Sequence, residues 1–269
     1  MSERTQVLDH GYVEAIEGWG SDERIIEAAR MSTGKGFLGW GPIEEACGCL
    51  FGMETCPADA FSPSGERRCS KCQGSQKVSR PGDEKLLRFL YENNHATPFE
   101  MGGLVIEVQA PIFVFREWHR HRTQSYNEMS ARYTPLPDIN YIPSVERLMI
   151  NAGATNKQAG TVAGAKDLTP DAAEQFRGHL QCIYDDAQQL YEHALDAGVP
   201  KELARIHLPV GRYSRMRASA NLRNWLAFLT LRKAANAQWE IRQYADAVGE
   251  LIAERFPRTW ALFVDGRRG

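Results

Sequence analysis

The segment from Trp118 to Tyr133 holds the side chains of this chain that are best suited to chemistry. It contains three arginines, two histidines, one glutamate and two serines, and it contains no lysine. Arginine presents a planar fork of donors that matches a phosphate or the edge of a pyrimidine, whereas lysine presents a point charge. Ser130 and Ala131 add a hydroxyl and a backbone donor. The segment therefore predicts a pocket for a small, planar anion.

A buried strand and a helix are expected to hold this segment in place. Leu104, Ile106 and Val108 recur at every second position, which predicts a strand with one face in the core. Pro111 then begins a helical stretch whose aromatic residues lead directly into the segment. The arginines and histidines should therefore stand on the end of a rigid, buried element.

Helical spacing recurs in several further parts of the chain. Thr169 and Pro170 are typical of a helix start, and Gly198 is typical of the position after a helix end. The expected helices span residues 22–30, 83–94, 170–197, 221–233 and 236–255. We predict one α+β domain over residues 1–269, with a small sheet and a helix-rich C-terminal half, interrupted by a Cys-rich insertion at 34–82. Cys182 is expected to be a core residue of the long helix.

The bulk composition narrows the function classes. The 269 residues include 32 basic and 34 acidic side chains, and this near neutrality argues against a nucleic-acid coat or a membrane-surface protein. The sequence has no apolar run of about eighteen residues and no signal-peptide hydrophobic region. We expect a cytoplasmic protein with small-molecule ligands.

Several motifs in order resemble one enzyme family. Arg120-His121-Arg122, then seven residues, then Ser130 resembles the signature of the flavin-dependent thymidylate synthases. The stretch 95–100 is similar to the family's His-x-Thr-Pro-Phe-Glu segment. The elements 203–205, 221–223, 231–232 and 237–240 are similar to its C-terminal motifs. The resemblance covers roughly residues 5–33 and 84–265.

The resemblance implies a set of ligands and the residues that hold them. For the substrate dUMP these are Glu117, Trp118, His119, Arg120, Glu128, Met129, Ser130, Ala131, Arg132, Arg205 and Arg232. For the cofactor FAD they are Thr97, Glu100, Arg120, His121, Arg122, Glu128, Asn221 and Arg223. The resemblance also implies NADPH as reductant, methylenetetrahydrofolate as one-carbon donor and a homotetramer. The resemblance implies a flavin that lies across subunit contacts, without the usual dinucleotide-binding fold.

Arg232 is the predicted catalytic residue. A guanidinium beside the pyrimidine would stabilise negative charge as N3 loses its proton, which polarises the ring for attack. The alternative for Arg232 is a helix-end salt bridge. A nucleophilic Ser130 would need an adjacent base and a third orienting group, and no Gly-x-Ser-x-Gly elbow surrounds it. We therefore favour a binding role for Ser130.

Other residues have competing interpretations. Thr97 to Glu100 also satisfies a capping box, and His119 with His121 could suggest a metal pair, although nothing nearby completes a ligand set. Three positions depart from residues common in the family. They are Glu117 in place of Gln, Ala227 in place of Asn and Asn236 in place of His, and they put cofactor affinity in doubt.

Five of the six cysteines lie in the insertion, between Cys47 and Cys72. Cys69-Ser-Lys-Cys72 resembles the zinc knuckles of the J-domain chaperones. Two such thiolate pairs make the closed site of structural zinc. We predict zinc at Cys69 and Cys72 with two of Cys47, Cys49 and Cys56; loose cysteines in a reduced loop are the alternative.

Two rival functions stay open at this point. One is a zinc-dependent module that binds RNA through its arginines. The other is a homologue that binds dUMP and flavin without turnover.

Overall fold

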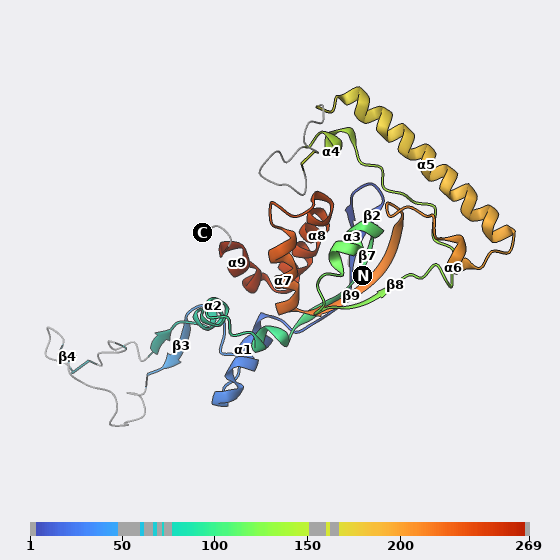
Figure 1. The fold of residues 1–269 in the computed structure, drawn as a ribbon. Coiled ribbons are helices and arrows are strands. Elements are labelled where there is room, and N and C mark those ends of the chain that lie inside the picture. Colours follow the sequence, from blue (N-terminus) through green and yellow to red (C-terminus); the bar gives the residue numbers. More distant parts are fainter. Residues whose placement is uncertain are drawn as a thin grey trace. The chain divides into compact units, whose positions relative to one another are not determined.

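The computed structural model describes residues 4–47, 60–61, 67–68, 72, 77–150, 160–161 and 167–266. Contacts divide the chain into two compact units, Met1–Trp19 with Gly102–Arg255 and Gly20–Met101 with Phe256–Gly269. Figure 1 shows the chain in sequence colours. The predicted α+β class, with a small sheet and a helix-rich C-terminal half, is confirmed. In the described part of the chain, no helix is both long and apolar enough to span a membrane.

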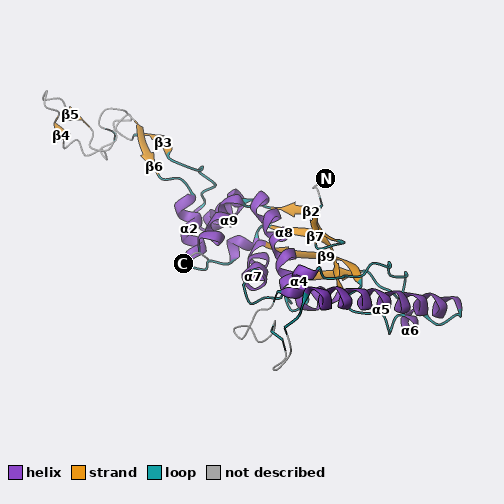
Figure 2. Cartoon of the chain, turned by 90° about the horizontal axis from the view of Figure 1, so that it is seen from above, coloured by secondary structure: helices purple, strands orange, loops and turns teal. Residues whose placement is uncertain are grey.

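The first unit is built on a five-stranded antiparallel sheet (Figure 2). In order across the sheet, the strands are β1 (Thr5–Val7), β2 (Gly11–Trp19), β7 (Gly103–Pro111), β9 (Tyr213–Asn221) and β8 (Ser125–Glu128). Leu104, Ile106 and Val108 of β7 are buried, so the strand predicted there is confirmed. The other face of the sheet is polar. On it Glu107 accepts hydrogen bonds from the Tyr12 hydroxyl at 2.8 Å and from Arg217 Nε at 3.3 Å.

Three helices pack on the sheet: α3 (Ile112–Trp118), α7 (Leu222–Arg232) and α8 (Trp239–Arg255). Trp118 lies between α7 and α8, stacks on Phe228 with 4.6 Å between ring centroids, and meets Trp225 and Tyr244 edge-on. All four rings are fully buried. Burial of such large apolar surfaces fixes α3 against the sheet. The predicted rigid platform beneath the arginine-rich segment is therefore present.

The long helix α5 (Pro170–Asp196) begins and ends where the sequence predicts. Thr169 Oγ1 accepts from Ala172 N at 3.2 Å, and Gly198 takes the left-handed φ of 82° that favours glycine after a helix end. Cys182 is exposed, so its prediction as a core residue is wrong. The reason is that α5 buries only a narrow stripe that includes Tyr184 and Tyr191.

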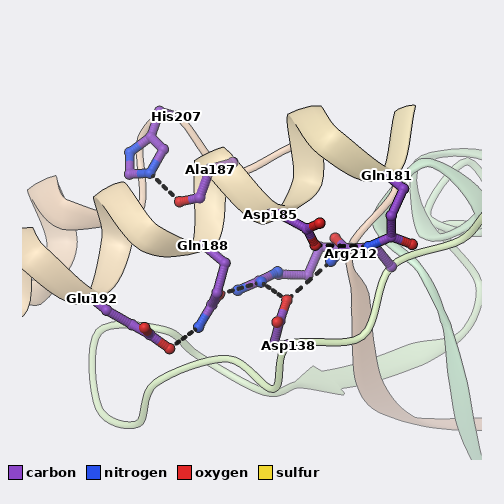
Figure 3. A network of polar contacts seen from close by, with 9 residues as sticks. Asp138, Gln181, Asp185, Ala187, Gln188, Glu192, His207 and Arg212 are labelled. Atoms are coloured by element: carbon purple, nitrogen blue, oxygen red, sulfur yellow. Dashed lines mark hydrogen bonds and ion pairs between the residues drawn. The ribbon is translucent and has the colours of Figure 1, made fainter. Parts of the chain in front are cut away.

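A polar network fastens α5 to the segment before β9 (Figure 3). Arg212 is almost completely buried and donates to Asp138 at 2.8 Å and to Gln188 of α5. His207 donates to the carbonyl of Ala187, also on α5, at 2.8 Å. The short helices α4 (Val145–Met149) and α6 (Lys201–Ala204) complete this unit.

The second unit contains α1 (Asp22–Arg30), η1 (Met31–Thr33), α2 (Glu84–Glu92), η3 (Thr97–Glu100) and α9 (Pro257–Asp265). Asp22 is 2% exposed and accepts from Thr259 Oγ1 at 2.6 Å and from the backbone N of Arg258 and Thr259. Its carboxylate therefore satisfies donors at the start of α9. The predicted insertion contains two short strand pairs that the sequence did not indicate, β3 (Ile43–Ala46) with β6 (Lys77–Arg80) and β4 (Ala60–Phe61) with β5 (Arg67–Arg68).

Candidate active site

A pocket of about 350 Å³ lies beside α3 in the first unit. One face of α3 forms a wall, because Ile112, Phe115, Arg116 and His119 recur at helical spacing. The facing wall and floor come from distant parts of the chain. These residues are Glu128, Met129, Ser130, Ala131, Leu136, Arg205 and Ser214.

Backbone hydrogen bonds hold the wall that contains Ser130. Met129 N donates to the Arg215 carbonyl at 2.8 Å, which extends the pairing of β8 with β9 by one residue. The Ser130 carbonyl accepts from the backbone N of Tyr133 at 3.0 Å and of Thr134 at 3.2 Å. Ser130 Oγ accepts from Arg132 N at 3.4 Å, so its own hydroxyl proton can point to a ligand.

The pocket combines cations with an apolar body. Arg116 and Arg205 supply positive charge, and Glu128 is the acidic residue in its lining. Phe115, Ile112 and Leu136 supply apolar surface. Such a site suits an anionic ligand that also carries a flat, less polar part.

The structure brings together many of the predicted substrate residues. His119, Arg205 and the stretch from Glu128 to Ala131 all line the pocket. Arg132, which follows Ala131 in the sequence, is exposed. The side chain of Trp118 lies in the core instead, where its Nε1 donates to Gln124 Oε1 at 3.0 Å. Only the backbone of Trp118 is therefore left for a ligand.

Arg232, the predicted catalytic residue, does not line this pocket. It is the last residue of α7 and donates three hydrogen bonds. Its Nη1 meets Glu117 Oε2 at 2.6 Å, its Nη2 meets the Glu117 carbonyl at 2.7 Å, and its Nε meets His121 Nε2 at 2.9 Å. The helix-end salt bridge considered as an alternative thus exists here, with Glu117 as partner. The remaining N–H donors of the guanidinium are those that can reach a ligand.

His121 is held neutral in this cluster. Burial and, to a lesser extent, the charge of Arg232 lower the pKa of His121 to about 4, while the charge of Glu117 opposes the shift. Since its Nε2 accepts from Arg232, the ring proton lies on Nδ1. The Tyr126 hydroxyl donates to the His121 carbonyl at 2.7 Å and so fixes the backbone of the signature motif.

The low pKa of His121 predicts a specific pH dependence of stability. A folded pKa of about 4, below the ordinary 6.5, means that the unfolded chain binds the proton first as pH falls. Stability should therefore decrease between about pH 6.5 and pH 4 because of this group. We expect His121→Gln to reduce that decrease in denaturant titrations, while the exposed control His179→Gln leaves it unchanged. An NMR titration that gives His121 an ordinary pKa would contradict this assignment.

The predicted flavin residues fall in both units. Arg120, Arg122 and Arg223 are exposed in the first unit. Asn221 caps α7, because its Oδ1 accepts from Asn224 N at 3.0 Å. The Asn224 side chain donates to the Thr123 carbonyl at 3.2 Å, which places the first turn of α7 beside the residue that follows Arg122 in the signature motif.

Thr97 and Glu100 lie in η3 of the second unit. The capping-box interpretation of Thr97 is wrong, because Thr97 is the first residue of η3 and Ala96 holds the N-cap position. The metal-pair interpretation of His119 and His121 gains no support, because His119 contacts Met216 Sδ at 3.2 Å and His121 contacts Arg232. Among the described residues, no group of three or more His, Cys, Asp or Glu side chains could hold a metal ion.

Five pocket residues were missed by the sequence analysis. They are Ile112, Phe115, Arg116, Leu136 and Ser214. Counting back from His119 at helical spacing could have identified Ile112, Phe115 and Arg116 on α3. No sequence signal marks Leu136 or Ser214, because tertiary packing alone brings them to the pocket.

The fold and the site together define an α+β protein whose pocket suits a small anion with a planar part. Residues 15–258 match the family Thy1, described as thymidylate synthase complementing protein. The chain belongs to this family, the flavin-dependent thymidylate synthases.

Relatives and a solved structure agree with this assignment. The flavin-dependent thymidylate synthase of Anaplasma marginale is 33% identical over 265 residues, covering 98% of this chain and 76% of the relative. That of Thermotoga neapolitana is 32% identical over 258 residues, covering 96% and 93%. The crystal structure of a UMP/dUMP methylase PolB from Streptomyces cacaoi, bound with 5-Br UMP, has a TM-score of 0.69 and 27% identity, covering 97% of this chain and 96% of that chain.

Proposed function

We propose that this enzyme methylates C5 of dUMP to form dTMP, with methylenetetrahydrofolate as the carbon donor, FAD as the hydride carrier and NADPH as the reductant of the flavin. The observation that carries the proposal is the pocket in which Arg205, Ser130 and one face of α3 meet. Its cations suit the phosphate of a nucleotide, and its apolar side suits the sugar and base. Neither rival, an RNA-binding module or a homologue without turnover, is favoured by any feature of this pocket.

The residues of this chain then have distinct tasks. Arg116, Arg205 and Ser130 hold the phosphate, and Arg232 stabilises negative charge on the pyrimidine. Ser130 is assigned to binding and not to nucleophilic attack, and the hydrogen bond that its Oγ accepts from Arg132 N at 3.4 Å supports this assignment. The flavin, when bound, supplies the hydride that completes the methyl group.

The residues predicted for FAD fit a pyrophosphate. Arg120 and Arg122 are exposed, and Arg223 is exposed in the first turn of α7. The N-terminus of this eleven-residue helix adds backbone donors and a positive dipole end. Asn221, Glu128 and the second-unit residues Thr97 and Glu100 remain proposed FAD ligands on the strength of the family resemblance.

Binding experiments test the proposal at the level of ligands. Purified protein should carry the yellow absorption of oxidised flavin, and dUMP should perturb that spectrum because the base is expected to stack near the flavin ring. CMP, which has a phosphate but a cytosine base, serves as the control nucleotide. A colourless protein that neither binds FAD nor responds to dUMP would overturn the proposed function.

A homotetramer is proposed from an exposed apolar stripe on α5. Phe176, Ile183 and Leu190 recur every seven residues and are 49%, 59% and 55% exposed. Leu203, Ile206 and Val210 add further exposed apolar side chains in the region that follows α5. Several exposed large apolar side chains along one helix favour a protein interface. Assembly would also explain why Arg232 lies outside the pocket of its own chain, since the family's sites are built between chains.

Ile183→Arg is expected to disrupt this assembly, because a buried unpaired charge destabilises an interface strongly. Light scattering should give a lower mass than the four chains proposed for the wild type. Gln189→Arg is the control, since Gln189 is exposed on another side of α5. An unchanged mass for Ile183→Arg would contradict the role of the stripe.

Structural zinc in the insertion remains a proposal. Cys47 and Cys72 are buried, at 2% and 6% exposure, as ligands of a closed site would be. Cys49, Cys56 and Cys69 lie outside the described residues. Replacing both Cys69 and Cys72 with Ser should remove zinc in elemental analysis, and Cys182→Ser should retain it. Equal metal content in all three proteins would dismiss the site.

A further inference from the structure

One hydroxyl in the pocket is buried without a partner. Ser214, the second residue of β9, is 1% exposed and lines the pocket beside α3. Among the described residues, its Oγ has no hydrogen-bond partner. Buried hydroxyl groups normally have a hydrogen-bond partner. Burial removes their hydrogen bonds to water, and leaving these bonds without a replacement costs free energy.

Apolar residues of β7 and α3 are neighbours of Ser214. Its neighbour across the strand pair is Ala110 of β7, which has no polar side chain. The facing helix α3 presents Ile112 and Phe115 to the same pocket. The cavity itself is therefore where the partner of the hydroxyl must come from.

The other donors of the pocket indicate which chemical group that partner is. Ser130, Arg116 and Arg205 line the same cavity, so three donor side chains of the first unit already surround it. A phosphate has several acceptor oxygens and needs donors from more than one direction. Ser214 stands on β9, where it pairs with Ala110 of β7, and the next residue, Arg215, accepts from Met129 N at 2.8 Å.

We infer that the Ser214 hydroxyl donates a hydrogen bond to the phosphate of the bound nucleotide and is a binding residue of this enzyme. The inference rests on the proposed function, which supplies dUMP as the ligand. Ser214 then gives the phosphate an uncharged hydrogen-bond donor in a fixed position, while the arginines supply positive charge. The phosphate then supplies the acceptor that this hydroxyl lacks among the described residues.

Ser214→Ala tests this assignment in the flavin-loaded protein by calorimetry. We expect dUMP to bind about tenfold more weakly, because a hydrogen bond to a charged group is lost. Inorganic phosphate should compete less well by a similar factor, and deoxyuridine, which has no phosphate, should bind as to the wild type. Ser214→Thr, which retains the hydroxyl, should restore dUMP affinity.

Stability provides a second measurement. The ligand-free Ser214→Ala protein should be as stable as the wild type or more stable, because it loses an unsatisfied polar group. Unchanged dUMP affinity in Ser214→Ala, or an equal loss for deoxyuridine, would overturn the phosphate assignment. A wild-type protein that fails to bind dUMP would instead overturn the proposed function, so the two failures are distinguishable.

Discussion

Arg232→Ala should lower kcat for dTMP formation by about a hundredfold or more while FAD stays bound. Removing a single donor that stabilises developing negative charge in an active site costs a factor of about 10²–10³. Arg232 is suited to this task because Glu117 and His121 hold its guanidinium at three positions, with its side chain only 14% exposed. A group oriented in advance needs little reorganisation when charge develops on the ring.

Arg232→Lys separates charge from geometry. Lysine keeps the positive charge but lacks the planar fork of donors with which arginine bonds both Glu117 and His121. We expect its activity to stay close to that of Arg232→Ala. Flavin absorbance and dUMP affinity serve as controls for folding and binding. Full turnover by Arg232→Ala would remove the catalytic assignment.

Glu117→Ala is expected to have the second largest effect, a decrease in kcat of about tenfold or more from the loss of Arg232 orientation. The resemblance assigned Glu117 to dUMP, but its carboxylate points to Arg232 Nη1 at 2.6 Å. We therefore expect kcat to change more than KM for dUMP. The Glu117 side chain is 42% exposed, so the effect on stability should be small, about 1 kcal/mol or less.

Glu117→Gln is the matched control for this substitution. Glutamine retains an acceptor oxygen for Arg232 and is the residue common in the family at this position. Its activity should therefore be close to wild type. The double variant Glu117→Ala with Arg232→Ala should have the same kcat as Arg232→Ala alone, because Glu117 acts only through Arg232. A rise in KM without a change in kcat would show that Glu117 contacts the nucleotide directly.

Local sequence signals predicted the elements that carry the site. The cap at Thr169, the glycine at 198 and the alternation of Leu104, Ile106 and Val108 all mark boundaries or faces that depend on nearby residues. These predictions are confirmed because burial and capping follow the same short-range pattern as the sequence.

Long-range pairing could not be predicted in the same way. The contact of Arg232 with Glu117 joins residues 115 positions apart. Strand β8 lies inside the signature motif, where its polar residues conceal the alternation. Strand β9 contains two arginines, two alanines and an asparagine, and alanine and asparagine have weak strand preference. Ser214 faces the pocket only because β9 pairs with β7 beneath α3.

The most direct test of the central claim is an anaerobic single turnover. Protein carrying reduced FAD is mixed with dUMP and methylenetetrahydrofolate, and flavin oxidation and dTMP are followed in the same sample. Our account predicts that both proceed at one rate, with one flavin oxidised for each dTMP formed. Flavin that stays reduced while dTMP accumulates, or flavin that is oxidised with no dTMP, would contradict it.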